Sequence, residues 1–206
     1  TTEDIDSIPY GGYLVTVTDA NNCVLLLDTT LIQPTELVAV ATTTSVYGDY
    51  DVSCYGSTNG TVDLNVTGGL TPYVYTWSTS ASTEDISGLG AGVYSVNVVD
   101  LNGCSDSAST IVIQPDSLVA NINSISNFNG FAISCNGASN GSIDAGVNGG
   151  MAPYDYSWSN GATTQDLLLL GAGNYTLIVT DSNSCVDSIS VTLTEPAPVV
   201  VVIDSI

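Results

Sequence analysis

The sequence repeats itself with a period of 81 residues, and this feature constrains the fold more than any other. Cysteines, tryptophans and prolines keep the interval without insertion or deletion through the 206-residue chain. The recurring positions include Cys23, Cys104 and Cys185; Cys54 and Cys135; Trp77 and Trp158; and Pro34, Pro115 and Pro196. A unit of this length can just bury a core of its own, so the period indicates separate domains and not solenoid turns.

The phase of the repeat divides the chain into four segments. We expect complete domains at 37–117 and 118–198, the C-terminal part of a preceding domain at 1–36, and the first strand of a following domain at 199–206. A proline stands at each boundary, where it fixes φ and removes a backbone donor, so strand pairing should end there. The prediction is a row of abutting domains, cut from a longer array and arranged as a rod.

Alternation of apolar and polar residues predicts the strands. Within one unit they are expected at 61–66, 73–77, 84–86, 92–98 and 107–113, with a split first strand at 37–46 and 50–53. Glycine and Asn-Gly signals mark the turns between them. Seven short strands in one unit, with no helical pattern, predict an all-β chain of tandem immunoglobulin-like β-sandwiches.

The charge composition excludes several classes of function. The chain has 21 Asp and Glu but no Lys, Arg or His, which makes its formal net charge −21. A chain without cations cannot neutralise phosphates, so nucleic acid and anionic membrane surfaces are poor partners. The common proton shuttles and Schiff-base amines are absent as well. No apolar run is long enough to insert into a membrane. We therefore expect a protein that is not an enzyme.

Two stretches resemble the SprB repeat. The first reads VSCYGSTNGTVDLNVTGGLTPYVYTWS at 52–78, and the second reads ISCNGASNGSIDAGVNGGMAPYDYSWSNGATTQD at 133–166. Such repeats occur in giant surface proteins of Bacteroidetes, including a mobile gliding adhesin. The resemblance implies type IX secretion across the outer membrane, extracellular display on the cell surface, and a role in adhesion or gliding motility. Its implied partners are tandem copies of the repeat, neighbouring filaments in a bundle, and a surface polysaccharide or substratum bound through other regions.

Five cysteines in a surface protein indicate disulfides. The favoured pairing joins Cys54 to Cys104 and Cys135 to Cys185, each within one repeat, and places the partner of Cys23 outside the fragment. The alternative joins Cys54 to Cys185 and would link neighbouring domains, because the far end of one domain abuts the near end of the next. Sequence alone leaves both pairings open.

Three aspartates recur in the pattern Asp-x-Asn-x-Cys, namely Asp19, Asp100 and Asp181. We favour a turn in which the carboxylate caps its own backbone. The alternative is a calcium site at the tip of the sandwich, with Asp49 and Asp51 as further ligands. Calcium is the one cofactor that the sequence leaves open.

The aromatic residues of the 73–77 strand and its counterpart have two interpretations. We expect Trp77 and Trp158 to pack in the sandwich core. The neighbouring tyrosines could instead form a carbohydrate-stacking surface at the rim. These tyrosines are Tyr73, Tyr75, Tyr154 and Tyr156.

Asp followed by Ser or Thr and then an apolar residue or Thr occurs more often than composition accounts for. The resemblance to Bacteroidetes surface proteins implies that this motif is an O-glycosylation acceptor, and glycans would sheathe and solubilise the shaft. The six candidates are Ser7, Thr29, Ser107, Ser117, Ser188 and Ser205.

These features predict the structural shaft of an extracellular filament or adhesin. The alternative function is a carbohydrate-binding or calcium-dependent surface module.

Overall fold

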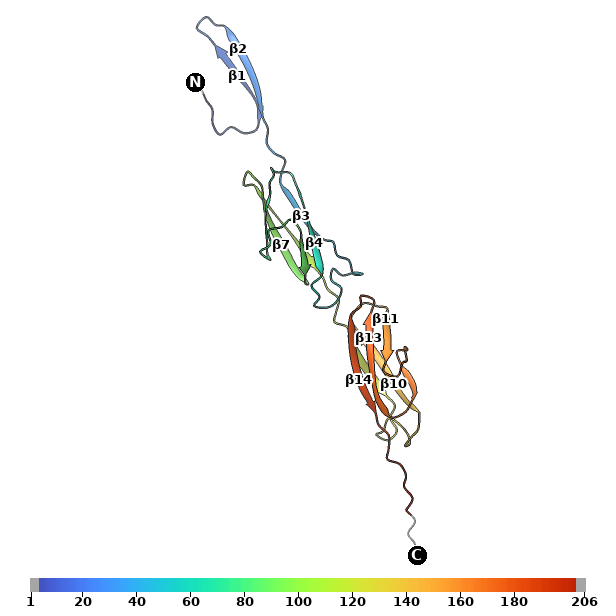
Figure 1. Cartoon of the computed structure of the whole chain (residues 1–206). Coiled ribbons are helices and arrows are strands. Elements are labelled where there is room, and N and C mark those ends of the chain that lie inside the picture. Colours follow the sequence, from blue (N-terminus) through green and yellow to red (C-terminus); the bar gives the residue numbers. More distant parts are fainter. Residues whose placement is uncertain (1–3, 203–206) are drawn as a thin grey trace. The chain divides into compact units, whose positions relative to one another are not determined.

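The computed structural model describes residues 4–202, which form fourteen strands and no helix (Figure 1). Accordingly, no described residue belongs to a helix that could cross a membrane. The first two strands form a hairpin, β1 (Gly11–Thr18) with β2 (Val24–Leu31). The next six are β3 (Val38–Thr43), β4 (Gly60–Thr67), β5 (Val74–Trp77), β6 (Ile86–Leu89), β7 (Gly92–Val99) and β8 (Ser105–Val112). The last six are β9 (Val119–Ile125), β10 (Gly141–Asn148), β11 (Tyr154–Trp158), β12 (Leu167–Leu170), β13 (Gly173–Asp181) and β14 (Val186–Leu193).

Each set of six strands forms two three-stranded sheets. The sheet orders are β3-β4-β6 and β5-β7-β8, then β12-β10-β9 and β11-β13-β14. Ile143 of β10, Trp158 of β11 and Leu177 of β13 belong to one buried cluster, so the last two sheets enclose a common core. The Asp187 carboxylate of β14 accepts the Ala120 amide of β9 at 2.8 Å and links the two sheets at their edge. This architecture confirms the all-β, immunoglobulin-like sandwich.

One predicted strand is wrong. Residues 50–53 form no strand, and each set has six strands where seven were expected. An isolated bridge pairs Tyr47 with Tyr50 and folds the segment back on itself. Asp51 then bonds to Ile113, just after β8, through both its amide (3.0 Å) and its carboxylate (2.8 Å). The backbone of this segment therefore satisfies its polar groups outside the sheets.

By its contacts, the chain divides into two compact units. The first comprises the residues up to Val40 with Asn65–Ser82 and Ser95–Ala108; the second comprises Ala41–Leu64, Thr83–Tyr94 and the residues from Ser109 on. The segment boundaries expected from the repeat stay a prediction. Of the strand expected at 199–206, residues 199–202 are outside any strand and 203–206 are outside the described residues.

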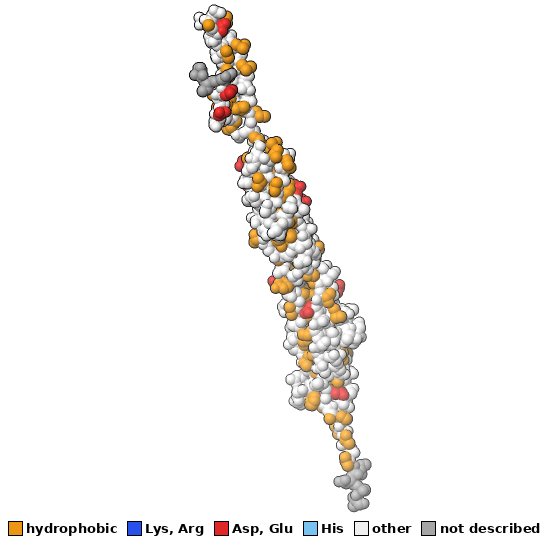
Figure 2. Space-filling view, turned by 60° about the vertical axis from the view of Figure 1, so that its left-hand side comes forward, with side chains coloured by type: hydrophobic (Ala, Val, Ile, Leu, Met, Phe, Trp, Pro, Cys, Tyr) orange, Lys and Arg blue, Asp and Glu red, His pale blue; other side chains and the backbone are white. Residues whose placement is uncertain are grey.

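The β1–β2 hairpin exposes side chains that the rest of the chain buries at equivalent positions. Val15 and Val17 are 43% and 55% exposed, whereas Val96 and Val98, which occupy the corresponding places in β7, are 2% and 0% exposed. A two-stranded hairpin has no second sheet against which to bury its apolar face. The assignment of residues 1–36 to a preceding domain stays a prediction. In Figure 2, acidic side chains are scattered over the visible face among apolar ones.

A double glycine ends β10 for a steric reason. Gly149 and Gly150 have φ of +65° and +62°, which glycine adopts without strain. A Cβ atom on Gly149 would lie 2.1 Å from the carbonyl oxygen of Ser117. The adjoining Gly150 amide donates to the Asp116 carbonyl at 2.9 Å, so the two backbone segments are in direct contact. Only glycine fits at this turn.

Candidate functional site

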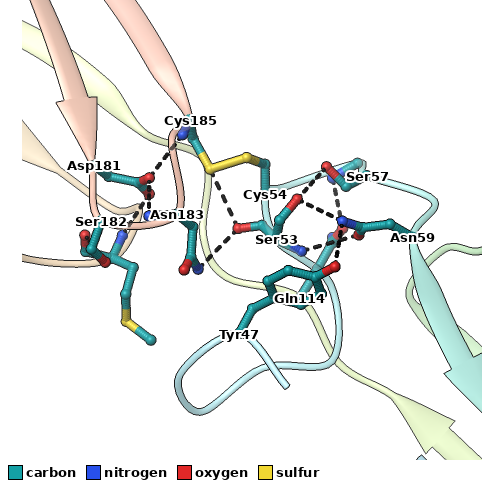
Figure 3. Close-up of a disulfide and its surroundings, with 12 residues drawn as sticks. Tyr47, Ser53, Cys54, Ser57, Asn59, Gln114, Asp181, Ser182, Asn183 and Cys185 are labelled. Atoms are coloured by element: carbon teal, nitrogen blue, oxygen red, sulfur yellow. Dashed lines mark hydrogen bonds between the residues drawn. A yellow bond between two sulfur atoms is a disulfide. The ribbon is translucent and has the colours of Figure 1, made fainter. Parts of the chain in front are cut away.

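A disulfide joins Cys54 to Cys185, with an S–S distance of 2.01 Å and a Cα–Cα distance of 5.8 Å (Figure 3). Cys54 lies in the loop between β3 and β4, and Cys185 in the turn between β13 and β14; 131 positions separate them in sequence. Both belong to the second compact unit. The favoured pairing of Cys54 with Cys104 and Cys135 with Cys185 is therefore wrong, and the alternative pairing is the one present. Cys23, Cys104 and Cys135 are free and exposed.

The length of a strand explains why Cys135 does not meet Cys185. Cys185 directly precedes β14. The loop that carries Cys135 is instead hydrogen-bonded to residues just after the C-terminal end of β14. The Gly137 amide donates to the Glu195 carboxylate at 2.7 Å. Eight strand residues span about 27 Å at 3.4 Å each, and a disulfide requires Cα atoms within about 7 Å.

The same geometry separates Cys54 from Cys104. Cys104 directly precedes β8, and the Gly56 amide in the Cys54 loop donates at 2.8 Å to the Gln114 side chain, just beyond the end of β8. The two cysteines therefore belong to opposite ends of one strand.

Hydrogen bonds hold the Cys54 loop in shape (Figure 3). Asn59 accepts the Ser53 amide at 3.1 Å and donates to the Ser53 hydroxyl at 3.0 Å and to the Tyr47 hydroxyl at 3.1 Å. The Ser53 carbonyl then accepts a bond of 3.1 Å from the Asn183 side chain, and the Cys185 sulfur lies 3.3 Å from the same oxygen. Side chains of the Cys54 loop thus fix the conformation of that loop, and this conformation places Cys54 within bonding distance of Cys185.

The turn that carries Cys185 is built around a buried aspartate. Asp181 is 4% exposed, and one carboxylate oxygen accepts the amides of Asn183 (2.9 Å) and Cys185 (2.8 Å) while the other accepts the Met151 amide (2.8 Å). Ser184 takes φ +67°. The turn interpretation of Asp-x-Asn-x-Cys is confirmed here. The carboxylate orders the turn and leaves the Asn183 side chain to bind Ser53.

Asp100 has the same role in the first unit. Its carboxylate accepts the Cys104 amide at 2.8 Å and the Leu70 amide at 3.0 Å. Burial acts to raise the pKa of Asp100, but the backbone hydrogen bonds from Cys104, Leu70 and Asn102 outweigh it and hold that pKa below its ordinary value. The group stays ionised and bonded to its own turn.

The remaining candidate calcium ligands do not gather. Asp19 accepts the amides of Asn21 and Cys23 at 2.8 Å each, and Asp51 accepts the Ile113 amide. Among residues 4–202, no three His, Cys, Asp or Glu side chains lie close enough to hold a metal ion. Calcium binds six to eight oxygens, and calcium binding at these aspartates stays a prediction.

The tryptophans lie in the core, as expected. Trp77 and Trp158 are 2% and 3% exposed, and the Trp158 indole donates to the Thr164 carbonyl at 2.9 Å. Their burial leaves no face open for sugar stacking.

The candidate carbohydrate-binding tyrosines are half-buried and are used within the chain. Tyr73 and Tyr154 donate their hydroxyls to the carbonyls of Gly68 (2.5 Å) and Gly149 (2.7 Å), so they fasten the double-glycine turns. Tyr156 bonds Gln165 at 3.2 Å, and Tyr75 is half-buried with a partner as well. Burial raises the pKa of Tyr156, and Tyr154 and Asp166 raise it further. Carbohydrate binding stays a prediction.

The glycosylation candidates within the described residues are all exposed. Ser107 and Ser188 occupy equivalent places on β8 and β14. The other exposed candidates are Ser7, Thr29 and Ser117, while Ser205 lies outside the described residues. Their modification stays a prediction.

Sequence reasoning missed two contributors to the disulfide site, Asn183 and Asn59. In each Asp-x-Asn-x-Cys turn the positive φ falls on the residue after the asparagine of the motif, at Asn22, Gly103 and Ser184. The recurrence of Asn21, Asn102 and Asn183 at one fixed distance before a cysteine was the signal that pointed to a bonding role.

Comparisons with known proteins place a family match on both repeats. The family described as SprB repeat matches residues 50–82 and 133–163, which confirms the resemblance at those two regions. No curated protein matches the chain.

Several solved structures are similar to the chain at low identity. A C-terminal 282-residue fragment of intimin is 13% identical, with a TM-score of 0.36 over 79% of this chain and 64% of the fragment. The eight N-terminal immunoglobulin domains of Down Syndrome Cell Adhesion Molecule are 15% identical, with a TM-score of 0.36 over 89% of this chain and 26% of that one. A tetra-tandem repeat from the extending region of a large adhesion protein is 18% identical, with a TM-score of 0.25 over 93% and 58%. The chain thus spans less than two thirds of each of these structures.

Proposed function

We propose that this chain, with its two SprB repeat matches, is a non-catalytic, tension-bearing segment of an extracellular adhesin or filament on the cell surface. Its tandem sandwiches form the shaft, and adhesion or gliding motility is the process that the shaft serves. Type IX secretion and contact with a polysaccharide or substratum through other regions belong to the same proposal. A charge of −21 with no cation keeps neighbouring shafts apart, and glycans on the exposed Ser and Thr candidates would add to that separation.

The Cys54–Cys185 disulfide carries the mechanical part of the proposal. Tension applied at the two ends of the chain passes from Cys54 directly to Cys185 through covalent bonds. The stretch between them, 131 positions long, is removed from the line of force. It includes all of β4 to β13, so most of the two sandwiches can stay folded under load.

Single-molecule extension tests this function. The chain is pulled from its two ends, first oxidised and then after reduction of the disulfide. We expect reduction to release about 450 Å of additional contour length, which is 131 residues at about 3.4 Å each. The Cys54→Ser variant should release the same length without reductant. An oxidised chain that already extends to the full length of the reduced chain would contradict a tension-bearing role for this disulfide.

Beads coated with an antibody against the repeat test the cellular role. Beads that move along living cells of the source organism indicate a motor-driven gliding adhesin. Beads that attach and stay fixed indicate a static filament and remove gliding from the proposal.

A further inference from the structure

We propose that a groove on the exposed face of the β3-β4-β6 sheet binds one neutral sugar unit of a polysaccharide through side-chain hydroxyls and carboxylates. The groove has a volume of about 250 Å³. The residues that line it with side-chain oxygens are Thr44, Thr61, Asp63, Asp85 and Ser87, and all of them belong to the second compact unit. The inference goes beyond the proposed function, which assigns contact with a polysaccharide to other regions, and it does not depend on that function.

Hydrogen bonds fix both sides of the groove. On one side, the Thr44 amide, just after β3, donates to the Thr61 carbonyl at 3.1 Å, and the Thr61 amide donates to the Ser45 hydroxyl at 3.0 Å. On the other side, one carboxylate oxygen of Asp85 accepts the Leu64 amide at 3.0 Å. Because these polar groups are already held in place, little conformational entropy is lost when a ligand binds them.

Several oxygens of the groove are free to bind a ligand. The Thr44 and Thr61 hydroxyl oxygens lie 2.8 Å apart and share one hydrogen bond, which leaves one hydroxyl hydrogen and further lone pairs unused. Among residues 4–202, the second carboxylate oxygen of Asp85 and both oxygens of Asp63 have no hydrogen-bond partner. The Ser87 side chain is exposed. The groove therefore offers two carboxylates that accept hydrogen bonds beside hydroxyls that both donate and accept them.

This set of groups suits the hydroxyls of a neutral sugar. A sugar hydroxyl both donates and accepts, and its bond to a carboxylate is of the stronger, charge-assisted kind. A sugar that carries phosphate, sulfate or carboxylate would instead be repelled, because the chain has a net charge of −21 and no Lys, Arg or His. Sites for drug-sized ligands begin at about 300 Å³, so a groove of about 250 Å³ is of the size for a single sugar unit.

The equivalent place in the second repeat lacks the hydroxyls. The counterparts of Thr44 and Ser87, 81 positions further on, are Ile125 and Leu168. Leu168 is 73% exposed and Ile125 is 39% exposed, so apolar side chains replace the hydroxyls at the surface. These side chains offer a sugar no hydrogen bond.

The equivalent place also lacks a free carboxylate at the position of Asp63. Its counterpart, Asp144, accepts a hydrogen bond of 3.1 Å from the Asn123 side chain. In the first repeat the counterpart of Asn123 is Thr42, which makes no bond to Asp63. The chain thus contains the proposed site once and, in the second repeat, a matched control for it.

The experiment titrates the whole ¹⁵N-labelled chain with glucose, galactose, mannose and N-acetylglucosamine, in the presence of a chelator, and follows the backbone amides by NMR. We expect at least one of these sugars to shift the amides of residues 61–63 and 85–87 in a saturable way. The expected Kd is about 2 mM, the value that ordinary ligand efficiency gives for twelve non-hydrogen atoms. The amides of residues 142–144 and 166–168 should not shift.

Matched variants test whether the carboxylate of the groove binds the sugar. Asp63→Asn keeps the size of an exposed side chain that bonds no other residue, so folding should be unchanged, while loss of a charge-assisted bond should raise Kd about tenfold. The control Asp144→Asn should leave Kd as it is.

Four results would each overturn the inference. They are no saturable shift with any of the four sugars, equal shifts in both repeats, an unchanged Kd in Asp63→Asn, and shifts at residues 61–63 and 85–87 that appear with calcium chloride but with no sugar. None of these results bears on the pulling experiment, which concerns the Cys54–Cys185 bond, so the failure of this inference and that of the proposed function are distinguishable.

Discussion

Replacement of Gly149 by alanine should destabilise the sandwich of β9 to β14 strongly. The new Cβ would lie 2.1 Å from the Ser117 carbonyl oxygen and 2.8 Å from the carbonyl carbon. These are backbone atoms, so the clash cannot be relieved by a side-chain rotation. The two segments must separate by about 1 Å, which breaks the bond between the Gly150 amide and the Asp116 carbonyl.

The magnitude follows from two contributions. Alanine in the left-handed region costs about 1 kcal/mol. Loss of the backbone hydrogen bond, together with local overpacking, costs about 2 kcal/mol more. The free energy of unfolding should therefore fall by about 3 kcal/mol in Gly149→Ala. The matched control is Gly161→Ala, because Gly161 also has positive φ (+88°) but a Cβ atom added there would meet no other atom within 4 Å. That variant should lose only about 1 kcal/mol.

Urea unfolding measures both variants. A Trp77→Phe background leaves Trp158 as the only tryptophan, so its fluorescence reports on the affected sandwich. The difference of about 2 kcal/mol between the variants corresponds to roughly 10 °C in Tm for a domain of this size. Equal midpoints for Gly149→Ala and Gly161→Ala would refute the argument that a rigid backbone contact, and not φ alone, requires glycine here.

Three further predictions concern the disulfide, the buried carboxylates and calcium. The double variant Cys54→Ser/Cys185→Ser should lower the urea midpoint, since closing a loop of 131 positions stabilises the folded state by about 5 kcal/mol in the chain-entropy model; an unchanged midpoint would contradict this. The amides of Ala39 and Ser107 hold the pKa of Asp106 below its ordinary value, so its stabilising effect is present above about pH 4 and is lost as the pH falls through the lowered pKa. Asp106→Asn should accordingly have a lower Tm than the wild-type chain at neutral pH, and this difference in Tm should disappear below about pH 4. A difference in Tm that does not change with pH would show that ionisation of Asp106 is not its cause. Tm should be the same in calcium and in chelator, and a rise with calcium would restore the calcium-dependent alternative.

Local patterns were sufficient to predict most strands. The alternation at 61–66 and 92–98 matches β4 (Gly60–Thr67) and β7 (Gly92–Val99), because side chains of a strand alternate between core and solvent. The burial of Trp158 was predictable because it depends on which face of a strand the side chain occupies. The turn at Asp181 was predictable because its hydrogen bonds to Asn183 and Cys185 join residues within four positions of each other. The segment 50–53 was mispredicted because its amide and carboxylate partners belong to Ile113, far along the chain.

The amino-acid sequence determined the period, the strands and the identity of the cysteines, because these depend on residue types at short or fixed intervals. Only the tertiary structure decided which cysteines meet. Cys135 and Cys185 lie at opposite ends of β14, a distance that no disulfide spans, whereas Cys54 and Cys185 have Cα atoms 5.8 Å apart. A disulfide depends on distance in space, and the pairing that looked simplest along the chain was separated by the full length of a strand.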